Sequence, residues 1–325
     1  MRSCDVLVVG GGPAGSTAAW RLCRDGADVV VLDQEAFPRL KLCAGWITPE
    51  VLRDLRFDPA DYPHRFMTFE HLRVHFRGLQ FRVRCTQHSI RRYEFDAWLL
   101  ERSGAPLLRH RVREIRRDGE DWIIDESFRC RYLIGAGGTR CPVYRQLFRG
   151  HHTRARELQA ATLEHEFPYD WHDGDCHLWF FERGLPGYAW YVPKANGFLN
   201  VGIGGMAQRL KGSADDIQAH WSRFTTMLEQ GLVRGGDWRA SGYSYYLHAP
   251  GGTGRIGNAF ITGDAAGLAT RDLCEGIGPA VRSGLRAAEA ILHGSPYELD
   301  GLTGSSLGGG LASRLLAWGF TRGAP

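Results

Sequence analysis

The chain has 325 residues, of which 43% are hydrophobic and 23% charged, a composition typical of globular proteins that excludes a disordered or fibrous chain. Lysine and arginine number 40 and aspartate and glutamate 36, so the net charge of +4 is too small to indicate a nucleic-acid-binding protein. No segment reaches the roughly 18 consecutive apolar residues of a spanning helix, so any membrane contact would be peripheral.

The first elements are predicted to form a βαβ unit. Residues 5–10 (DVLVVG) are a valine-rich run bounded by glycines, typical of a buried parallel strand. Pro13 suits a first helical position, and good helix formers continue to residue 24 before Gly26 closes the helix. A second apolar run over residues 29–32 completes the unit.

The next segments are predicted to form strands, one helix and further strands. Residues 66–84 alternate apolar and basic side chains, the period of a strand with one solvent-facing side. Residues 91–102 place apolar side chains at helical spacing, and residues 122–136 contain strand runs after an Asp-Gly turn signal at 118–119. Residues 158–205 are rich in aromatic residues and valine and are interrupted by turn signals, which predicts several antiparallel strands.

A helix is predicted over residues 213–228. Ser213 and Asp216 have the spacing of a capping box, and apolar residues recur along one face of the segment that follows. Strand signals return over residues 238–247, which predicts that the helix interrupts a sheet.

The last elements again pair a short apolar strand with a helix, as the opening βαβ unit does. A short strand is predicted over residues 259–262, and a helix over residues 276–292. Three glycines at 308–310 predict a flexible loop, followed by a short apolar helix over residues 311–320.

This order of elements predicts an α/β protein with two interleaved lobes. A Rossmann-like nucleotide-binding lobe would be assembled from residues 1–64, 90–150 and 250–325. A substrate-binding lobe built on an antiparallel sheet would take residues 65–89 and 151–249.

A glycine pattern, Gly10-x-Gly12-x-x-Gly15, follows the first predicted strand and opens the first predicted helix. In such a turn the glycines permit a tight bend, the close approach of a pyrophosphate and close helix–strand packing. Asp33 ends the second strand at the spacing of a carboxylate that accepts hydrogen bonds from an adenosine ribose. The pattern predicts dinucleotide binding without distinguishing NAD from FAD.

A second glycine-acid cluster lies at residues 260–267 (FITGDAAG), and a Glu-Gly-Ile-Gly segment follows at 275–278. Here the chain resembles the FAD-dependent oxidoreductases with a glutathione-reductase-like (GR2 type) FAD-binding lobe. The resemblance implies FAD as cofactor and a contact between Asp264 and its ribityl chain. It also implies that backbone around residues 276–278 stabilises negative charge on the reduced flavin ring.

Three further segments narrow the resemblance. Residues 39–49 (RLKLCAGWITP) resemble the K-x-C-G-G segment of the geranylgeranyl reductase family, and residues 187–194 (GYAWYVPK) resemble its Y-x-W-x-F-P motif. Arg92 opens a segment similar to the R-x-x-F-D helix start of that family. The chain is thus similar to the geranylgeranyl reductases, which are related to flavin monooxygenases and halogenases.

The chain also departs from these patterns at three places. Ala44 replaces the first glycine of the C-G-G segment, and Val192 replaces the aromatic residue before the proline. Gly137 and Gly138 stand where related flavin enzymes carry Asp-Gly, which weakens any inference about NADPH docking.

The motifs and the resemblance together give the predicted site. The cofactor-binding residues would be Gly10, Gly12, Pro13, Ala14, Gly15, Asp33, Gln34, Arg39, Cys43, Ala44, Gly45, Arg92, Gly137, Gly263, Asp264, Gly276, Ile277 and Gly278. The catalytic residues would be Cys43, Tyr188 and Trp190.

These three catalytic assignments each have a structural alternative. Tyr188 and Trp190 share one face of a predicted strand and would line an apolar pocket opposite the flavin, or they are ordinary packing residues of a sheet. Cys43, with Lys41 nearby to lower its pKa, would be a proton donor or a flavin neighbour, or it is a small buried hydrophobe.

The resemblance implies an FAD-dependent oxidoreductase that reduces carbon–carbon double bonds of an isoprenoid or another apolar small molecule by hydride transfer from reduced flavin. With a single dinucleotide fingerprint, NADPH would bind transiently as electron donor, or a redox partner protein would reduce the flavin. Two alternatives stay open: an FAD-dependent monooxygenase or halogenase, and a flavin-binding module without catalytic activity.

Cysteine and histidine spacing gives no indication of a metal site. None of the eight cysteines forms a CxxC pair, and the thirteen histidines show no HExxH spacing. The first residues lack the features of a secretory signal. These observations predict a cytoplasmic protein with reduced thiols and no bound metal.

Overall fold

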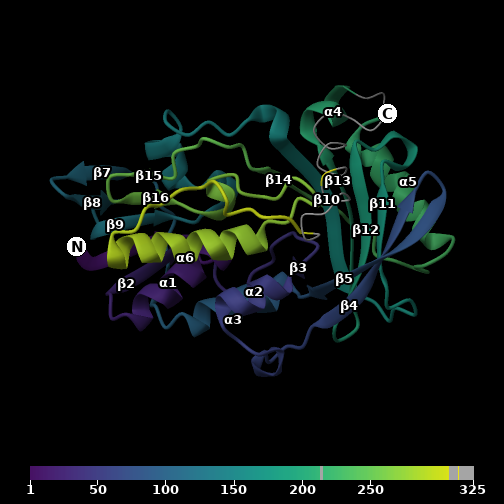
Figure 1. Ribbon diagram of the computed structural model, residues 1–325, viewed down its shortest axis with the longest axis horizontal. Helices are drawn as coiled ribbons and strands as arrows, with labels where there is room; N and C mark the ends of the chain where they lie inside the picture. Colours follow the sequence, from purple (N-terminus) through teal and green to yellow (C-terminus); the bar gives the residue numbers. More distant parts are fainter. Residues whose placement is uncertain (213–214, 307–313, 315–325) are drawn as a thin grey trace.

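The computed structural model describes residues 1–212, 215–306 and 314 (Figure 1). Two eight-stranded sheets lie at opposite ends of the molecule, and the chain passes between them several times. The loop and helix expected over residues 308–320 fall almost wholly outside the described residues. The predicted α/β class, with a parallel Rossmann-like sheet beside a second sheet, is confirmed.

The first sheet has a parallel centre built from the opening βαβ unit. Its strands in spatial order are β15 (Arg255–Ile256), β16 (Ala259–Ile261), β9 (Phe128–Gly135), β1 (Arg2–Val9), β2 (Val29–Asp33) and β6 (Leu107–Arg109), and the hairpin of β7 (Ile115–Asp118) and β8 (Asp121–Ile124) joins β9. The central strands are buried on both faces, which explains why their sequences are continuous apolar runs rather than alternating ones.

Helices α1 (Pro13–Arg24), α2 (Pro49–Leu55), α3 (Arg92–Arg102) and α6 (Ile277–His293) gather beside this sheet (Figure 1). Helices α1 and α6 pack closely because both carry glycine or alanine at the contact. A Cβ on Gly284 of α6 would lie 2.3 Å from the carbonyl oxygen of Ala14 in α1. This contact brings the first turns of both helices to the same region of the molecule.

The second sheet is antiparallel at every pair but one. Its strands in spatial order are β14 (Ser241–Tyr246), β10 (Gln159–Pro168), β13 (Phe198–Met206), β12 (Gly187–Lys194), β11 (Cys176–Phe180), β4 (Met67–Phe76), β5 (Leu79–Ser89) and β3 (Trp46–Ile47). The sheet is antiparallel as predicted except between β4 and β11, which pair in parallel. The chain runs through the first sheet between these two strands, and such a long crossover allows parallel pairing where a hairpin does not.

The outer face of the second sheet is covered by α4 (Ala207–Gly212) and α5 (Ile217–Glu229). Trp221, Phe224 and Leu228 of α5 are buried against it, as the helical spacing predicts. The predicted cap is wrong, because Asp216 is itself the N-cap and accepts a hydrogen bond from the Ala219 amide at 2.8 Å. Ser213, the expected cap, lies outside the described residues.

The predicted lobe boundaries stay a prediction, and one strand complicates them. Residues 46–47, which were assigned to the nucleotide-binding lobe, form β3 and pair with β5 in the second sheet. The chain therefore enters the second sheet earlier than the sequence indicates.

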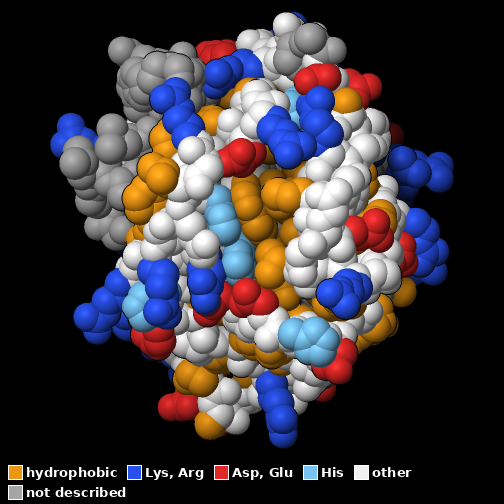
Figure 2. All heavy atoms as spheres, turned by 90° about the vertical axis from the view of Figure 1, so that its right-hand side faces the viewer, with side chains coloured by type: hydrophobic (Ala, Val, Ile, Leu, Met, Phe, Trp, Pro, Cys, Tyr) orange, Lys and Arg blue, Asp and Glu red, His pale blue; other side chains and the backbone are white. Residues whose placement is uncertain are grey.

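The face at the β4, β11 and α5 end is mostly ringed by charged side chains, with a strip of hydrophobic and histidine side chains in a furrow between ridges (Figure 2).

Over the described ranges, no helix combines the length and apolar character needed to cross a bilayer. All eight cysteines are unpaired.

Candidate functional site

A cavity of about 760 Å³ lies between the two sheets and collects most of the predicted site. It is lined by the predicted cofactor residues except Gly15, Gly45 and Gly278, and by Cys43, Tyr188 and Trp190. The volume falls in the range of small-molecule sites, roughly 300 to 1,000 Å³. Residues from both ends of the sequence thus meet around one space.

The glycine turn at one end of the cavity is shaped by contacts that exclude side chains. Gly10 has φ +112°, and a Cβ there would lie 2.4 Å from the carbonyl oxygen of Ala136. A Cβ on Gly15 would lie 1.9 Å from the carbonyl oxygen of Gly10. Gly15 therefore acts through helix–strand packing and not through contact with the cavity, which agrees with the role expected of the third glycine.

Asp33 is fixed at the same end of the cavity by two backbone amides. Its carboxylate accepts hydrogen bonds from Gly11 N at 2.8 Å and from Glu35 N at 3.0 Å. Each carboxylate oxygen retains a further lone pair, so the group can still accept a ligand hydroxyl. The arrangement fits a ribose contact.

Two arginines and one buried carboxylate lie beside the glycine turn. Arg92 donates to both oxygens of Asp96, at 2.6 and 2.8 Å, and Arg39 approaches the same carboxylate at 3.4 Å. Burial acts to lower the pKa of Arg92, but the Asp96 charge outweighs it and the pKa is raised. A Cβ on Gly12 would lie 3.3 Å from Nη2 of Arg39. Two guanidinium groups share one carboxylate, which leaves positive charge next to the turn where a pyrophosphate would bind.

The second glycine-acid cluster lies beside the glycine turn, since a Cβ on Gly263 would lie 3.3 Å from Cβ of Ala14. Gly263 follows β16 with φ +55°, and its amide donates to Ser283 Oγ of α6 at 2.9 Å. Asp264 accepts a hydrogen bond from the Tyr243 hydroxyl at 3.2 Å, and Gly276 lies directly against its carboxylate. Burial, and then the Asp264 charge, raise the pKa of Tyr243. Asp264 thus lines the cavity, and its contact with a ribityl chain stays a prediction.

The start of α6 carries a buried carboxyl group, Glu275, that the sequence did not single out as a site residue. Glu275 is buried in the cavity wall, and its Oε1 accepts a hydrogen bond from Gly278 N at 2.6 Å. Burial raises the pKa of Glu275 to about 7, against the opposing effects of the Gly278 amide and the Arg282 guanidinium. The amide of Gly278 is therefore already engaged, and Gly276 and Ile277 are the residues of this turn that line the cavity.

Glu275 should make the protein less stable as pH rises. Its pKa is about 7 in the folded protein against an ordinary value of 4.5, so the folded state binds more protons in this window and stability falls with pH. From about pH 5 to about pH 6.5 the loss should be about 2 kcal/mol. Glu275→Gln keeps an acceptor for the Gly278 amide and removes the titration, so urea unfolding at the two pH values should show a smaller difference.

The matched control is Glu120→Gln, which neutralises a carboxylate whose side chain is 95% exposed. That variant should retain the full pH dependence of the wild-type protein. If the free energy of unfolding of Glu275→Gln changed with pH as much as that of wild type, a group other than Glu275 would be the one that takes up the proton.

Tyr188 and Trp190 form an aromatic wall on the cavity face of the second sheet. They lie opposite Gly204 and Gly202 in the neighbouring strand, and a Cβ on Gly202 would lie 2.2 Å from the Trp190 ring. Both glycines make room for the Trp190 ring over β13, since a Cβ on Gly204 would lie 3.4 Å from it. Trp190 Nε1 donates to Asn200 Oδ1 at 2.7 Å.

The Tyr188 hydroxyl has a structural partner. It donates to the carbonyl oxygen of Leu273 at 2.6 Å, and burial raises the pKa of Tyr188 well above its usual range. Tyr188 is therefore a wall residue and a poor proton donor, whereas the sequence analysis grouped it with the catalytic residues.

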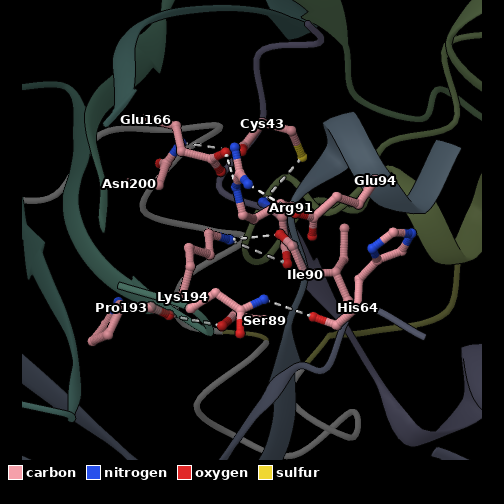
Figure 3. A network of polar contacts seen from close by, with 12 residues as sticks. Cys43, His64, Ser89, Ile90, Arg91, Glu94, Glu166, Pro193, Lys194 and Asn200 are labelled. Carbon is pink, nitrogen blue, oxygen red and sulfur yellow. Dashed lines mark hydrogen bonds and ion pairs between the residues drawn. The ribbon is translucent and has the colours of Figure 1, made fainter. Parts of the chain in front are cut away.

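A polar network fixes the segment that carries Cys43 (Figure 3). The Lys194 side chain has no exposed surface, and its ammonium donates to the carbonyl oxygens of Ala44, of Ile90 at 2.9 Å and of Gly45 at 3.5 Å. Gly45 has no room for a side chain, because a Cβ would lie 2.2 Å from Ile90 O. The predicted cofactor residue Gly45 thus has a packing role.

Cys43 lies at the cavity edge of this network. Its Sγ accepts a hydrogen bond from Gly45 N at 3.3 Å and interacts with the Arg92 guanidinium, and its carbonyl oxygen accepts from Asn200 Nδ2 at 3.3 Å. Lys41, expected mainly as a neighbour of Cys43, places its ammonium 3.2 Å from the centroid of the Tyr243 ring. The Lys41 ammonium therefore interacts with the Tyr243 ring and Asp264 as well as with the Cys43 thiol.

Glu164 is the other site residue that sequence reasoning missed. It lies on β10, is 2% exposed and lines the cavity beside Trp190. The available signal was a carboxylate on the strand face that otherwise carries Ala160 and Thr162. Burial lowers the pKa of Lys41 and raises the pKa of Glu164, while the opposite charges of these two groups reduce both shifts.

Comparison with known proteins identifies similar sequences over most of the chain. Residues 8–76 match the family model of an NAD(P)-binding Rossmann-like domain. The menaquinone reductase of Mycolicibacterium smegmatis is 28% identical over 316 residues, covering 89% of this chain and 76% of the relative. The geranylgeranyl diphosphate reductase of Rhodobacter capsulatus is 28% identical over 336 residues, covering 91% and 78%. The digeranylgeranylglycerophospholipid reductase 1 of Methanopyrus kandleri is 30% identical over 217 residues, covering 62% and 57%.

Solved structures show that the fold is shared more widely. A geranylgeranyl bacteriochlorophyll reductase-like protein of Thermoplasma acidophilum superposes with a TM-score of 0.76 and 20% identity, over 90% of this chain and 78% of that one. The flavin-dependent halogenase CmlS superposes with a TM-score of 0.71 and 20% identity, over 93% and 61%. At these identities the likeness concerns the fold.

Proposed function

We propose that this chain, a member of the geranylgeranyl reductase family of FAD-dependent oxidoreductases, reduces carbon–carbon double bonds of an isoprenoid or another apolar small molecule. The observation that carries the proposal is the composition of the cavity of about 760 Å³, whose lining combines the glycine turn and Asp33 with the Tyr188 and Trp190 wall. Relatives over about nine-tenths of the chain are named reductases of menaquinone and of geranylgeranyl diphosphate.

The residues present fit an FAD molecule. In our proposal Asp33 binds the adenosine ribose, residues 10–14 with Arg39 surround the pyrophosphate, and Asp264 binds the ribityl chain. Gly10 and Gly12 both line the cavity, and a side chain on Gly12 would extend toward Arg39 Nη2, where the pyrophosphate would bind, which supports this assignment. When bound and reduced, the flavin supplies the hydride. The aromatic wall orients the apolar substrate and excludes water from the cavity.

Asp264→Ala should weaken FAD binding by about tenfold to a hundredfold, because a buried hydrogen bond to a charged group contributes roughly 1.5 to 3 kcal/mol. Fluorescence titration of the apoprotein with FAD measures the change in Kd. Asp118→Ala removes a largely exposed carboxylate on the β7 hairpin and should leave the Kd unchanged. Equal Kd values for Asp264→Ala and wild type would place the ribityl contact elsewhere.

The electron donor in our proposal is NADPH bound transiently or a protein reductant. The sequence has one glycine fingerprint of the dinucleotide type, which leaves no second Rossmann unit for a resident nicotinamide. Anaerobic mixing of the FAD-loaded protein with NADPH, and separately with reduced ferredoxin, distinguishes the two donors by the rate at which the flavin absorbance bleaches. Because the named relatives act on lipids and quinones, we further propose that the protein takes its substrate at a membrane surface.

The proposed activity is tested with chemically reduced, FAD-loaded protein under anaerobic conditions. Geranylgeranyl diphosphate and menaquinone are added separately, flavin reoxidation is followed by absorbance, and the products are examined by mass spectrometry. Reoxidation together with a gain of two hydrogens located in the isoprenoid chain by fragmentation supports the reductase, because reduction of the quinone ring to a quinol gives the same total mass. No reoxidation by either compound would contradict it and would favour a flavin-binding module.

A monooxygenase or halogenase remains the second candidate because halogenases share the fold. Mixing the reduced protein with oxygenated buffer tests it. Slow recovery of the oxidised-flavin spectrum through a separate absorbing species would favour oxygen chemistry over our proposal.

A further inference from the structure

We propose that Glu164 is the acid that supplies the proton for the reduction, with Lys41 and Asn200 stabilising the carboxylate that forms. The inference rests on the proposed reductase function and assigns a further catalytic residue to the same cavity. It depends on the position of Glu164, on the groups that face it and on the poor fit of its rivals.

The position of Glu164 follows from the register of the second sheet. It lies on β10 directly opposite Gly202 of β13, and Gly202 in turn lies opposite Trp190 of β12. A Cβ on Gly202 would lie 2.8 Å from Cβ of Glu164 and 2.2 Å from the Trp190 ring. The missing side chain therefore leaves the carboxyl group and the indole next to each other on the wall where an apolar substrate would lie.

Asn200 defines the orientation of the carboxyl group. Its Oδ1 accepts from Trp190 Nε1 at 2.7 Å, so its amide nitrogen must point the other way. That nitrogen donates to Glu164 Oε2 at 3.4 Å and to the Cys43 carbonyl oxygen at 3.3 Å. Within the part of the chain that the structure describes, Oε1 of Glu164 has no hydrogen-bond partner. One oxygen is thus anchored and the other is available to the cavity.

The charges facing Glu164 come from three neighbouring segments. Burial, the largest effect, favours the protonated form, and Glu166 on the same strand favours it too. The ammonium groups of Lys41 and Lys194 favour the carboxylate. The charge of Asp264, which also lines the cavity, in turn favours the charged form of Lys41. This balance raises the pKa of Glu164 to about 7, so part of the population carries the proton at neutral pH, and the conjugate base is stabilised once the proton has left.

The two rival donors are less suitable. The Tyr188 hydroxyl donates its proton to Leu273 O, and its pKa is raised well above the usual range. Cys43 Sγ accepts a hydrogen bond from the Gly45 amide and interacts with the Arg92 guanidinium. Both neighbours are hydrogen-bond donors, so the sulfur acts as an acceptor in both contacts. Glu164 alone of the three combines a free oxygen with a place on the aromatic wall.

The step balances as a two-electron reduction. The π bond of the substrate breaks, one carbon receives a hydride with its electron pair from the reduced flavin, and the other carbon receives the proton from Glu164. The resulting carboxylate lies near the Lys41 ammonium and accepts from Asn200, and a solvent proton restores the acid.

Infrared spectroscopy of the FAD-loaded protein tests the protonation state without any substrate. The difference spectrum between wild type and Glu164→Gln should contain the C=O stretch of a protonated carboxyl group at neutral pH, and the band should titrate well above the ordinary glutamate range. Glu166→Gln is the matched control, since it removes the next carboxylate on the same strand face, which is paired with Arg91 outside the cavity. Absence of the band from the Glu164 difference spectrum would overturn the proposal whether or not the protein is a reductase.

Turnover provides the second arm, with geranylgeranyl diphosphate as the probe. Glu164→Gln should lower kcat by about a hundredfold or more with little change in KM or FAD affinity, as expected for a lost general acid. Glu164→Asp retains an acid and should recover part of the rate and of the pH profile, which separates catalysis from misfolding. Wild-type kcat in Glu164→Gln would overturn the assignment, whereas no turnover by the wild type would count against the reductase function and leave the infrared result to decide on Glu164.

Discussion

Gly15→Ala is expected to abolish FAD retention and to lower the free energy of unfolding by at least about 3 kcal/mol. The added methyl group would lie 1.9 Å from the Gly10 carbonyl oxygen and 3.0 Å from a Val8 methyl. A backbone oxygen cannot move aside as a flexible side chain can, so helix α1 must shift from the end of β1. That shift moves the turn which would hold the pyrophosphate.

The direction of this effect is diagnostic because alanine is a better helix former than glycine by about 1 kcal/mol. Intrinsic propensity alone would make Gly15→Ala stabilising, so any loss reports the contact with Gly10. Urea denaturation and the FAD content of the purified protein measure the two effects. In Gly212→Ala a Cβ at the end of α4 meets none of the described residues within 4 Å, and this control should be neutral or slightly more stable than wild type. Comparable stability of the two variants would contradict the packing argument.

Lys194→Met should destabilise the protein by about 3 kcal/mol and weaken FAD binding at the same time. Methionine retains much of the side-chain volume but removes the donors that serve the carbonyl oxygens of Ala44, Gly45 and Ile90. Each buried acceptor left without a partner costs roughly 1 to 3 kcal/mol. Burial lowers the pKa of Lys194, so removing the ammonium relieves some desolvation, but three unpaired carbonyls outweigh that relief.

Only three lysines occur in the sequence, which gives this substitution a close control. Lys211 is exposed, and Lys211→Met should leave both the unfolding midpoint and the Kd for FAD unchanged. If Lys194→Met lowered stability but left FAD affinity intact, the network in Figure 3 would support the second sheet without positioning the Cys43 segment.

Individual helices and strands could be predicted because each is indicated by a few residues that are close together in the sequence. The run before Gly10, Pro13 at the first helical position and the spacing of Trp221 and Phe224 on α5 each determine a strand or a helix from a few neighbouring residues. The start of α5 was misplaced because Ser213 and Asp216 are both good caps, and only the geometry of the first turn distinguishes them.

The non-local pairings could not be read in the same way. Two residues at 46–47 are too short for any periodic signal, so β3 was missed. The direction of β11 relative to β4 depends on the path of the intervening chain and not on either strand sequence.

The candidate site shows the same division. The glycine motifs and Asp264 line the cavity because motif spacing encodes a local turn. Glu164, Glu275 and Lys194 were missed because their importance comes from burial and from partners distant in sequence. Gly15 and Gly45 do not line the cavity, and their contacts with Gly10 and Ile90 give them packing roles that support the turns on which the predicted cofactor site depends.

The parallel pairing of β4 with β11 has a consequence for the order of folding. Leu72 pairs with Cys176, so this pairing in the second sheet cannot form until the chain between the two residues has been synthesised. Pairings this remote must overcome loop-closure entropy before their contacts form, which makes folding slow. The β4 and β5 hairpin would therefore wait with an unpaired edge while the nucleotide-binding sheet assembles, and a cofactor that accelerates this assembly would also shorten the time in which that edge can aggregate.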